Sequence, residues 1–354
     1  MSGELRVLLV GAGRAGLVHG RNFAAGVPGA RLVGIADPDA AALEQSATAL
    51  DCSRTFTDPE KAVQDERVDA VVIASPTFTH AALAVAALGA GKHVLCEKPL
   101  ASTLEEAAAI PAAAEAARGV FLMGFMRRFD AAFARAAERI AAGDIGTPVL
   151  VRSTGRGPGL PPEWAWDATR SGGLVAEVNS HDLDTIRWLS GQELASVYAL
   201  GRSAKRPDIA ERYPGFVDVV VATFELDGGA LAQLDGACPA DYGYDARAEV
   251  YGTEGVVFVG DARARAPLVV RAGSAETDPV RSWRTLFGEA YRAEDTHFVA
   301  AAHGDEQPRT SVEDGLRALE GVVAVNRSLT EGRAVTVAEA AVAGGSEPMS
   351  MGPA

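Results

Sequence analysis

The sequence predicts an α/β protein of two domains: a doubly wound parallel sheet, followed by an α+β domain with a large open, mostly antiparallel sheet. In about the first 120 residues, short β-branched segments alternate with longer Ala-rich segments, as they do in βαβ units. After Gly124 the strand-like segments are longer and are separated by short turns such as Asp-Gly-Gly, which is typical of antiparallel strands. A chain of 354 residues also exceeds the roughly 250–300 residues at which single cores stop growing.

The first domain is expected over 1–123, where strands and helices alternate. Short apolar runs predict strands at 6–10, 31–36, 54–56, 69–74, 93–96 and 120–123. The segments between them predict helices at 15–25, 38–50, 58–64, 79–88 and 103–118. Ser102 followed by Glu105 predicts a capping box at the start of the last helix, in which each side chain accepts a hydrogen bond from a backbone N–H.

The second domain is expected over 124–342. It begins with a helix at 130–141, a turn at 143–148, a Gly/Pro/Trp loop at 155–173 and a second helix at 174–189. Alternating segments then predict strands at 196–201, 217–226, 230–238, 246–251, 255–259 and 267–271. Helices return at 286–303 and 312–329, and the Gly/Ser/Pro-rich end at 343–354 is expected to be disordered.

Composition excludes several classes of protein. With 33 Lys and Arg against 47 Asp and Glu, the net charge of −14 argues against a nucleic-acid partner, which rewards cationic side chains. No apolar run reaches the roughly 20 residues of a membrane helix, and the N-terminus lacks the pattern of a signal peptide. The three cysteines, Cys52, Cys96 and Cys238, form neither a CxxC pair nor a disulfide framework, so a reducing cytoplasm is the expected location.

A glycine-rich loop predicts a dinucleotide site. The residues Gly11, Ala12, Gly13, Arg14, Ala15 and Gly16 follow the first strand and open the first helix, whose N–H groups can bind phosphates. Asp37 stands 21 residues after Gly16, at the end of the second strand. Its carboxylate can accept hydrogen bonds from the adenosine ribose and repel a 2′-phosphate, so NAD is favoured over NADP, although Arg14 leaves NADP open. Alternatively, Asp37 only starts a turn.

Two further segments reach the carboxyl ends of the parallel strands, where such sheets bind ligands. After the fourth strand, Ser75, Thr77 and His80 are candidates to line the cofactor, while Thr79 and His80 alternatively cap the next helix. After the fifth strand, Glu97 and Lys98 are further candidates to line the cofactor, and they are followed by Pro99, whose peptide bond can be cis. A lysine at the end of a buried strand is costly unless a ligand or partner meets its charge.

A third constellation lies in the second domain. Glu177 and His181 are four residues apart on a predicted helix, which places them on one face, and Asp184 follows three residues later. A histidine oriented by a carboxylate is suited to act as a general base near neutral pH. The alternative is an amphipathic helix with its polar groups in solvent. A metal site is not expected, because no further His or Cys cluster accompanies this pair.

Taken together, GAGRAG, CEKP and GG-x3-E-x3-H resemble the Gfo/Idh/MocA family of NAD(P)-dependent oxidoreductases over nearly the whole chain. The stretches GFMRRFD (124–130) and YGYDAR (242–247) are most similar to its inositol dehydrogenase branch. The resemblance implies a Rossmann domain, and a second domain whose sheet face supports a dimer or tetramer. It places the catalytic lysine at Lys98 and the catalytic histidine at His181. Glu177 stands where the family has aspartate.

The implied function is NAD-dependent oxidation of a secondary ring hydroxyl of a cyclitol, such as an inositol, or of a related sugar. His181 would accept the proton, Lys98 would hydrogen-bond the oxygen, and Glu177 would orient the histidine. Polar and aromatic residues are further candidates to bind a polyol: Arg127, Trp164, Trp166, Asp167, Tyr242 and Tyr244.

These binding residues also have structural alternatives. Arg127 or Arg128 can pair with Asp130, the tryptophans can anchor the loop, and the tyrosines can belong to the sheet. Other functions stay open as well: an aldose or amino-cyclitol dehydrogenase acting reductively, a glycosidase that retains NAD, or an NAD-sensing regulator. The presence of both Lys98 and His181 argues against the sensor, which needs neither.

Overall fold

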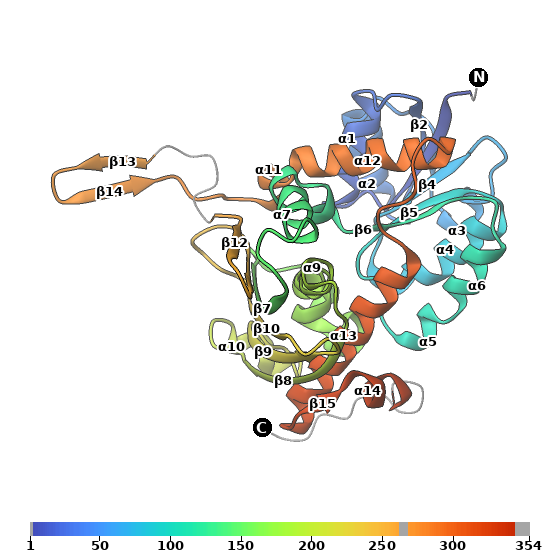
Figure 1. Cartoon of the computed structure of the whole chain (residues 1–354). Helices are drawn as coiled ribbons and strands as arrows, with labels where there is room; N and C mark the ends of the chain where they lie inside the picture. The colour runs from blue at the N-terminus through green and yellow to red at the C-terminus, as the bar shows by residue number, and fades with distance from the viewer. Residues whose placement is uncertain (1–2, 262–267, 344–354) are drawn as a thin grey trace. The chain divides into compact units, whose positions relative to one another are not determined.

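The computed structural model describes residues 3–261 and 268–343, and its chain divides into two compact units (Figure 1). The first unit contains the chain up to Phe129 together with Gly288–Leu316, and the second contains Asp130–Phe287 and the chain from Arg317 onward. This division differs from the predicted boundaries of 1–123 and 124–342, because helix α12 (Gly288–His303) packs against the first unit. Of the tail expected to be disordered, 344–354 lies outside the described residues.

The predicted doubly wound sheet of the first unit is confirmed. Its six strands are parallel and lie in the order β3-β2-β1-β4-β5-β6. They span β1 (Leu5–Val10), β2 (Ala30–Ala36), β3 (Thr55–Phe56), β4 (Ala70–Ile73), β5 (His93–Glu97) and β6 (Phe121–Gly124). Every residue of β4 is buried, as expected of a central parallel strand covered on both faces.

The connections of the first unit are helices. All lie within a few residues of a predicted position except η2, where no helix was predicted. They are α1 (Gly16–Ala24), α2 (Ala40–Ala49), α3 (Pro59–Ala62), η1 (Thr77–Thr79), α4 (His80–Gly89), α5 (Leu104–Ala107), α6 (Ala109–Ala116) and η2 (Met126–Phe129). The helix predicted at 103–118 is two helices. Pro111 has no N–H to donate to the carbonyl of Ala107, which accounts for the break.

The predicted capping box is wrong by one residue. The N-cap is Thr103, whose Oγ1 accepts a hydrogen bond from the N–H of Glu106 at 3.1 Å. The Glu106 carboxylate in turn accepts from the N–H of Ser102 at 3.0 Å. Both Ser-x-x-Glu and Thr-x-x-Glu fit the motif here, and the chain uses the second pair.

The second unit contains a seven-stranded sheet in the order β12-β11-β7-β10-β9-β8-β15. All neighbours are antiparallel except β7 and β10, which are parallel, so the mostly antiparallel sheet is confirmed. The strands are β7 (Pro148–Arg156), β8 (Leu194–Arg202), β9 (Val219–Leu226), β10 (Leu231–Ala237), β11 (Asp245–Gly252), β12 (Val256–Val259) and β15 (Val335–Thr336). A separate hairpin pairs β13 (Leu268–Arg271) with β14 (Ser274–Thr277). Pro267, the predicted start of β13, lies outside the described residues.

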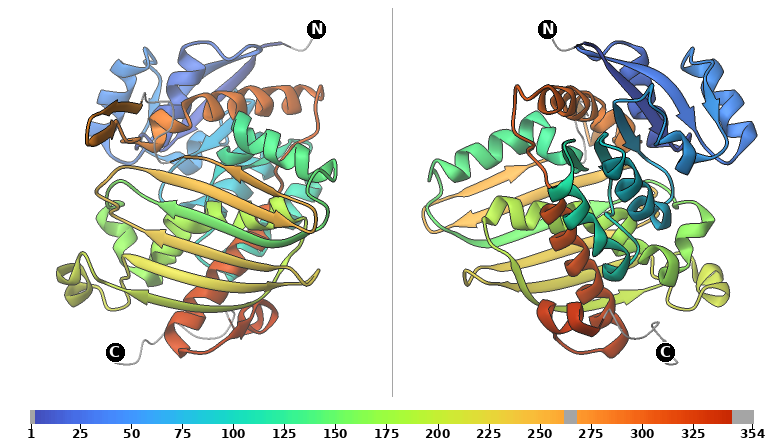
Figure 2. Two further views of the ribbon diagram at one scale, coloured as in Figure 1. Left: turned by 60° about the vertical axis from the view of Figure 1, so that its left-hand side comes forward. Right: turned by 90° about the vertical axis from the view of Figure 1, so that its right-hand side faces the viewer.

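The second unit also contains helices, of which α9 packs against β7, β10 and β11 on one face of the sheet. They are α7 (Ala131–Ala141), η3 (Glu163–Trp166), α8 (Ala168–Ser171), η4 (Val175–Asn179), α9 (Ser180–Ser190), α10 (Pro207–Arg212), α11 (Trp283–Leu286), α13 (Val312–Glu331, which begins in the first unit) and α14 (Val337–Ala343). Figure 2 shows α9 and α13 behind the sheet and leaves the opposite face uncovered. Within 3–261 and 268–343, no helix has the length and apolar character needed to span a membrane.

Candidate active site

The glycine loop between β1 and α1 has the geometry that a dinucleotide requires. Gly11 has φ +98°, and a Cβ there would lie 2.5 Å from the carbonyl oxygen of Ala74. A Cβ on Gly16 would lie 1.9 Å from the carbonyl oxygen of Gly11, so this glycine permits the helix to begin where it does. A Cβ on Gly13 would meet nothing within 4 Å, so the loop is open on that side to a phosphate.

The side chain of Asp37 is hydrogen-bonded to the same loop. Its Oδ2 accepts a hydrogen bond from the N–H of Ala12 at 2.8 Å, and its Oδ1 accepts from the N–H of Asp39 at 2.9 Å. The second contact is the turn-forming role considered from the sequence. A carboxylate has about four lone-pair sites, so hydroxyl groups of a ribose can still donate to it. No side-chain cap is observed on α1. Because the N–H groups of Leu17 and Val18 bond to the carbonyls of Gly13 and Ala15, an anion would be met by the N–H groups that precede them in the loop.

The segment after β4 is held by the buried side chain of His80. One ring nitrogen of His80 lies 2.7 Å from the carbonyl oxygen of Pro99, and the other lies 2.8 Å from that of Ser75. Burial lowers the pKa of His80. The histidine therefore ties together two of the loops at the carboxyl edge of the sheet. No side chain of Thr79 or His80 caps α4, so the predicted capping role is wrong for both.

At the end of β5, two neighbouring side chains have different environments. Lys98 is partly exposed, and its peptide bond to Pro99 is cis. Glu97 is buried, with Oε1 3.2 Å from Nε2 of His19 and Oε2 accepting from the N–H of Lys98 at 3.1 Å. Sequence reasoning treated Glu97 as a cofactor residue and did not single out His19. Arg127, in η2 directly after β6, is only 1% exposed.

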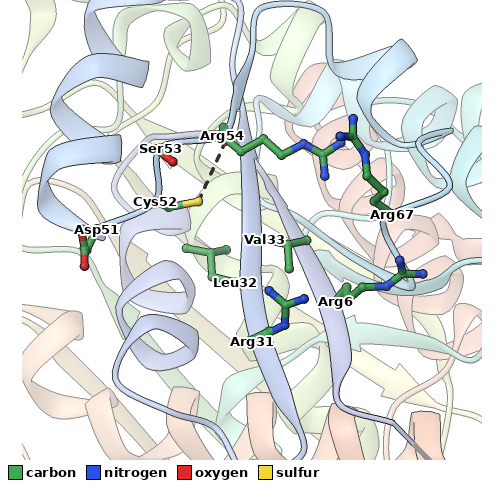
Figure 3. Close-up of a pocket in the computed structure, with 9 residues that line it drawn as sticks. All are labelled: Arg6, Arg31, Leu32, Val33, Asp51, Cys52, Ser53, Arg54 and Arg67. Carbon is green, nitrogen blue, oxygen red and sulfur yellow. Dashed lines mark hydrogen bonds between the residues drawn. The ribbon is translucent and has the colours of Figure 1, made fainter.

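A pocket of about 400 Å³ in the first unit lies at the opposite ends of the strands, where β1 and β2 begin (Figure 3). Four arginines line it, but each has a carboxylate partner: Arg6 with Asp69, Arg31 with Glu4, and Arg54 and Arg67 with Asp65. Its positive charge is therefore largely compensated. Its lining includes Arg31–Val33 in the first half of β2, whereas Gly11 and Asp37 follow the ends of β1 and β2, so we do not assign the pocket to the cofactor.

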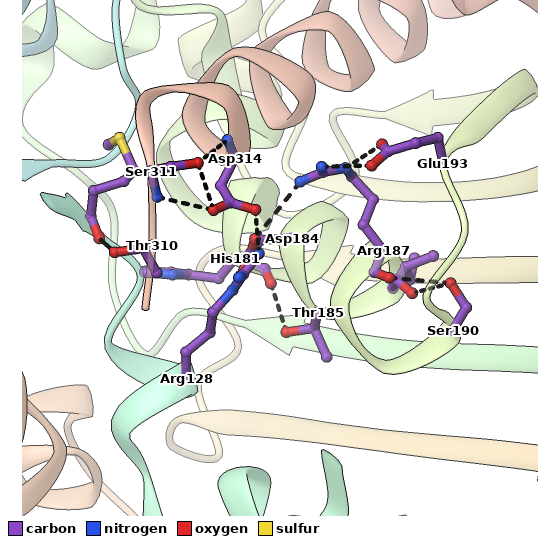
Figure 4. A network of polar contacts seen from close by, with 12 residues as sticks. Arg128, His181, Asp184, Thr185, Arg187, Ser190, Glu193, Thr310, Ser311 and Asp314 are labelled. Carbon is purple, nitrogen blue, oxygen red and sulfur yellow. Dashed lines mark hydrogen bonds and ion pairs between the residues drawn. The ribbon is translucent and has the colours of Figure 1, made fainter. Parts of the chain in front are cut away.

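In the second unit, Glu177 and His181 lie on consecutive helical segments. Glu177 is half-buried in the π-turn η4, and His181 is 5% exposed in the first turn of α9. A π-turn is rare and often marks a functional site. Nearby, Asp184 lies 3.8 Å from the guanidinium of Arg187, which forms a closer ion pair with Glu193 (Figure 4).

Three buried polar side chains fix the start of α9 against the sheet. Asp182 accepts hydrogen bonds from Ser153 Oγ at 2.6 Å and from Asn179 Nδ2 at 2.8 Å. Asn179 also donates to the carbonyl of Gly155 at 3.1 Å. Gly155 pairs with Gly236 on β10, and a Cβ on either would lie within 2.2 Å of an oxygen of Asp182 or Asn179. Paired glycines on neighbouring strands are the signal from which this close approach could have been predicted.

The Trp-containing loop has structural contacts of its own. Asp167 caps α8 by accepting from the N–H of Thr169 at 3.0 Å. Trp166 donates from Nε1 to the carbonyl of Pro161 at 3.0 Å, so this tryptophan anchors the loop, as the structural alternative stated. Trp164 is half-buried.

The other polyol candidates also have structural contacts. Tyr242 is 43% exposed and donates to Asp245 at 2.6 Å, whereas the ring of Tyr244 is buried edge-on against Phe287. Asp130 caps α7, and Arg128 pairs with Asp314 at 2.7 Å (Figure 4).

Both halves of the chain match models of one protein family. Residues 5–125 match the model of an oxidoreductase family with an NAD-binding Rossmann fold. Residues 133–258 match the GFO/IDH/MocA C-terminal domain. The chain belongs to the Gfo/Idh/MocA family. This Gfo/Idh/MocA protein is therefore an oxidoreductase, and its first unit is an NAD-binding domain.

Relatives of this Gfo/Idh/MocA chain are similar along nearly their whole length. It is 36% identical to scyllo-inositol 2-dehydrogenase (NAD(+)) of Bacillus subtilis, covering 95% of this chain and 97% of the relative. It is 32% identical to myo-inositol 2-dehydrogenase of Thermotoga maritima, covering 95% and 99%. The crystal structure of scyllo-inositol dehydrogenase from Lactobacillus casei with bound NAD(H) and scyllo-inositol matches with a TM-score of 0.87 and 28% identity, covering 94% of this chain and 99% of that one.

Proposed function

We propose that this protein is an NAD-dependent dehydrogenase that oxidises one secondary ring hydroxyl of an inositol to the ketone. The observation that carries the proposal is the similarity to inositol dehydrogenases over both units, at 36% identity across 95% of this chain. The open glycine loop and the carboxylate of Asp37 beside it support NAD as the cofactor.

The roles proposed for the side chains follow from their chemistry. The glycine loop would hold the pyrophosphate, and Asp37 the adenosine ribose. When bound, NAD supplies the acceptor for the hydride that leaves the substrate carbon. His181 would take the proton of the hydroxyl, while the Lys98 ammonium donates to its oxygen and stabilises the developing negative charge. Glu177, one methylene longer than aspartate, would orient His181.

The test of the reaction is NADH absorbance measured at substrate excess over a panel of inositols, aldoses and glycosides. We expect free NADH to accumulate in proportion to an oxidised inositol. Product from a glycoside without net NADH would instead indicate a glycosidase, and no response to any compound in either direction would indicate a sensor. Oxidation of NADH by a keto sugar or keto-cyclitol alone would favour the reductive alternative.

Removing either proposed catalytic side chain should abolish most turnover. Lys98→Ala and His181→Ala should each lower kcat by about 10²–10⁴-fold, the range typical of a lost general acid or base, while the Kd for NAD changes little. Residues of the same types outside the proposed site are matched controls: Lys61→Ala, at an exposed lysine, and His303→Ala, at a half-buried histidine, should retain wild-type rates. Near-normal turnover in either catalytic variant would overturn its assignment.

We also propose that the protein forms a homo-oligomer through the uncovered face of the seven-stranded sheet. Large apolar side chains are exposed there across the sheet, including Leu200 on β8, Leu231 on β10, Tyr251 on β11 and Phe258 on β12. Many exposed apolar side chains on one sheet face commonly mark an interface between chains. Ion pairs such as Arg152 with Glu249 lie among them and would give the contact polar partners.

A further inference from the structure

We propose that His19 is a positioning residue for Lys98, acting through the buried carboxylate of Glu97. This inference rests on the role proposed above for Lys98. His19 lies within α1, the helix that follows the glycine loop, and its side chain is fully buried. Its Nδ1 is 2.6 Å from Oδ1 of Asp295 on α12, and its Nε2 is 3.2 Å from Oε1 of Glu97 on β5.

The geometry requires His19 to donate from both ring nitrogens. Each nitrogen lies beside a carboxylate oxygen, which can only accept when ionised, and a neutral imidazole has one N–H. The imidazolium form satisfies both contacts. Burial alone would lower the pKa of His19, but the carboxylates of Asp295 and Glu97 raise it well above its ordinary value. His19 therefore carries a positive charge at neutral pH.

The two carboxylates are themselves held in place. Asp295 accepts a second hydrogen bond, from Nδ2 of Asn22 at 2.7 Å. Glu97 accepts from the N–H of Lys98 at 3.1 Å, and it packs against Gly124 on β6, where a Cβ would lie 2.9 Å from the Cα of Glu97. A continuous series of contacts thus runs from α12 through His19 to the main chain of Lys98.

Glu294, beside Asp295 on α12, is a third buried carboxyl group near His19, and its protonation state decides the net charge around this histidine. Its carboxyl group is fully buried, and neither oxygen has a hydrogen-bond partner within the described part of the chain. Burial, together with the charges of Glu97 and Asp295, raises the pKa of Glu294 well above its ordinary value. A neutral Glu294 leaves two carboxylates facing the cations of His19 and Lys98, with the ring of Tyr291 edge-on to His19.

Loss of the His19 charge would leave Glu97 as a buried carboxylate whose remaining nearby cation is Lys98. The carboxylate would then attract the Lys98 ammonium, or take up a proton and lose the negative charge that faces this ammonium. Either change displaces the ammonium from the reacting oxygen. Because small displacements of a catalytic group can reduce rates by about 10²-fold, the effect should fall on kcat.

The experiment compares isosteric variants in the full-length holoenzyme, with kcat expressed per titrated NAD site so that loss of folded protein does not count. Using scyllo- and myo-inositol, we expect His19→Gln and Asp295→Asn to lower kcat about 10- to 100-fold with NAD affinity within about threefold. Glu294→Gln mimics the protonated acid and should keep kcat within about threefold of wild type. Asn22→Ala should lower kcat less than His19→Gln and serves as the milder variant if His19→Gln does not fold.

Coupling to Lys98 separates a positioning role from a purely structural one. If His19 acts through Lys98, the double variant Lys98→Ala with His19→Gln should turn over no more slowly than Lys98→Ala. A wild-type kcat per site in His19→Gln, beside an inactive Lys98→Ala, would overturn the inference and leave the proposed function standing. A normal rate in Lys98→Ala would overturn both. Equal damage from Glu294→Gln and Asp295→Asn would refute the charge assignment.

Discussion

At the scale of single residues, the carboxylate of Asp37 has two roles: it holds the glycine loop, and it is proposed to bind the cofactor. It accepts from the N–H of Ala12 in the glycine loop and is the proposed acceptor for the ribose. Asparagine keeps one acceptor oxygen for the loop but removes the charge that repels a 2′-phosphate. A variant at this position should therefore separate the two roles.

We expect Asp37→Asn to weaken NAD binding about tenfold while NADP binding is unchanged or improved, and Asp37→Ala to weaken both because the loop loses its anchor. Dissociation constants for both nucleotides, measured by NADH and NADPH fluorescence, check this. The control is Asp39→Ala, which removes the N-cap of α2 and leaves cofactor preference unaltered. An unchanged ratio of NAD to NADP affinity in Asp37→Asn would contradict the ribose role.

Glu294 predicts a pH dependence of stability. Its pKa is raised in the folded state, so above the ordinary pKa of a glutamate the unfolded chain loses a proton that the folded chain keeps. This group therefore makes the free energy of unfolding fall as pH rises toward the folded pKa, by up to about 1.4 kcal/mol per pH unit. Glu294→Gln removes that linkage.

Urea denaturation from pH 5 to 9 should thus show the stability of wild type declining relative to Glu294→Gln as pH increases. The raised pKa of His19 acts in the same direction, since its contribution is full below the unfolded pKa and is lost as pH rises through the folded one. Because His19 is present in both proteins, it largely cancels in the comparison. A constant difference across this range would mean that Glu294 is ionised in the folded protein.

The residues that sequence reasoning could identify are those whose role is local. Gly11, Gly16 and Asp37 lie within one β-α-β segment, in which Asp37 accepts a hydrogen bond from the glycine loop. His19 and Asp295 are 276 residues apart, and a contact at that separation leaves no trace in the spacing of one sequence. The predicted cofactor role of Glu97 overlooked this partner, because the motif shows where the residue lies and not which way it points.

At the scale of elements, most strands and helices were predictable because their apolar periodicity is strong. The elements that were not predicted include α10, β14, β15 and α14. The longest of them is strand β7, which lies between β10 and β11 in the sheet, and only a turn and a loop were predicted around it. Two of its inward positions are Ser153 and Gly155, which face the buried Asn179 and Asp182 instead of apolar side chains. Strand β7 therefore lacks the alternation of apolar and polar residues that marks a strand, at the positions where it contacts the start of α9.

The close approach of Gly155 to Asp182 predicts that one added methyl group will lower both stability and activity. A Cβ on Gly155 would lie 1.9 Å from Oδ2 of Asp182, so Gly155→Ala must displace the start of α9 and with it His181. We expect a loss of about 1–3 kcal/mol in the free energy of unfolding, as for other overpacked sites, and a lower kcat in the protein that remains folded. Gly159→Ala is the control, because its Cβ would meet nothing within 4 Å. Wild-type kcat and stability in Gly155→Ala would show that α9 is not held in this way.

At the scale of the whole molecule, the net charge of −14 and an anionic cofactor are compatible. Backbone N–H groups at Gly11–Gly16 can meet a pyrophosphate without a basic surface, and Asp37 uses one of the negative charges to select the ribose. The overall charge describes the exterior, and the chemistry depends on a few locally placed groups.

The uncovered sheet face makes the last prediction, which concerns assembly. Leu231 and Phe258 are 54% and 71% exposed, so aspartate at both positions should change the stability of one chain by no more than about 0.5 kcal/mol each. In a symmetric interface, however, each substitution is present on both sides and buries unpaired carboxylates.

Light scattering coupled to gel filtration should find wild type at a multiple of 36.7 kDa and the double variant at a smaller mass. Val342→Asp on α14, equally apolar and 82% exposed but off the sheet, should keep the wild-type mass. A wild-type protein that elutes as a single chain would remove the case for this interface.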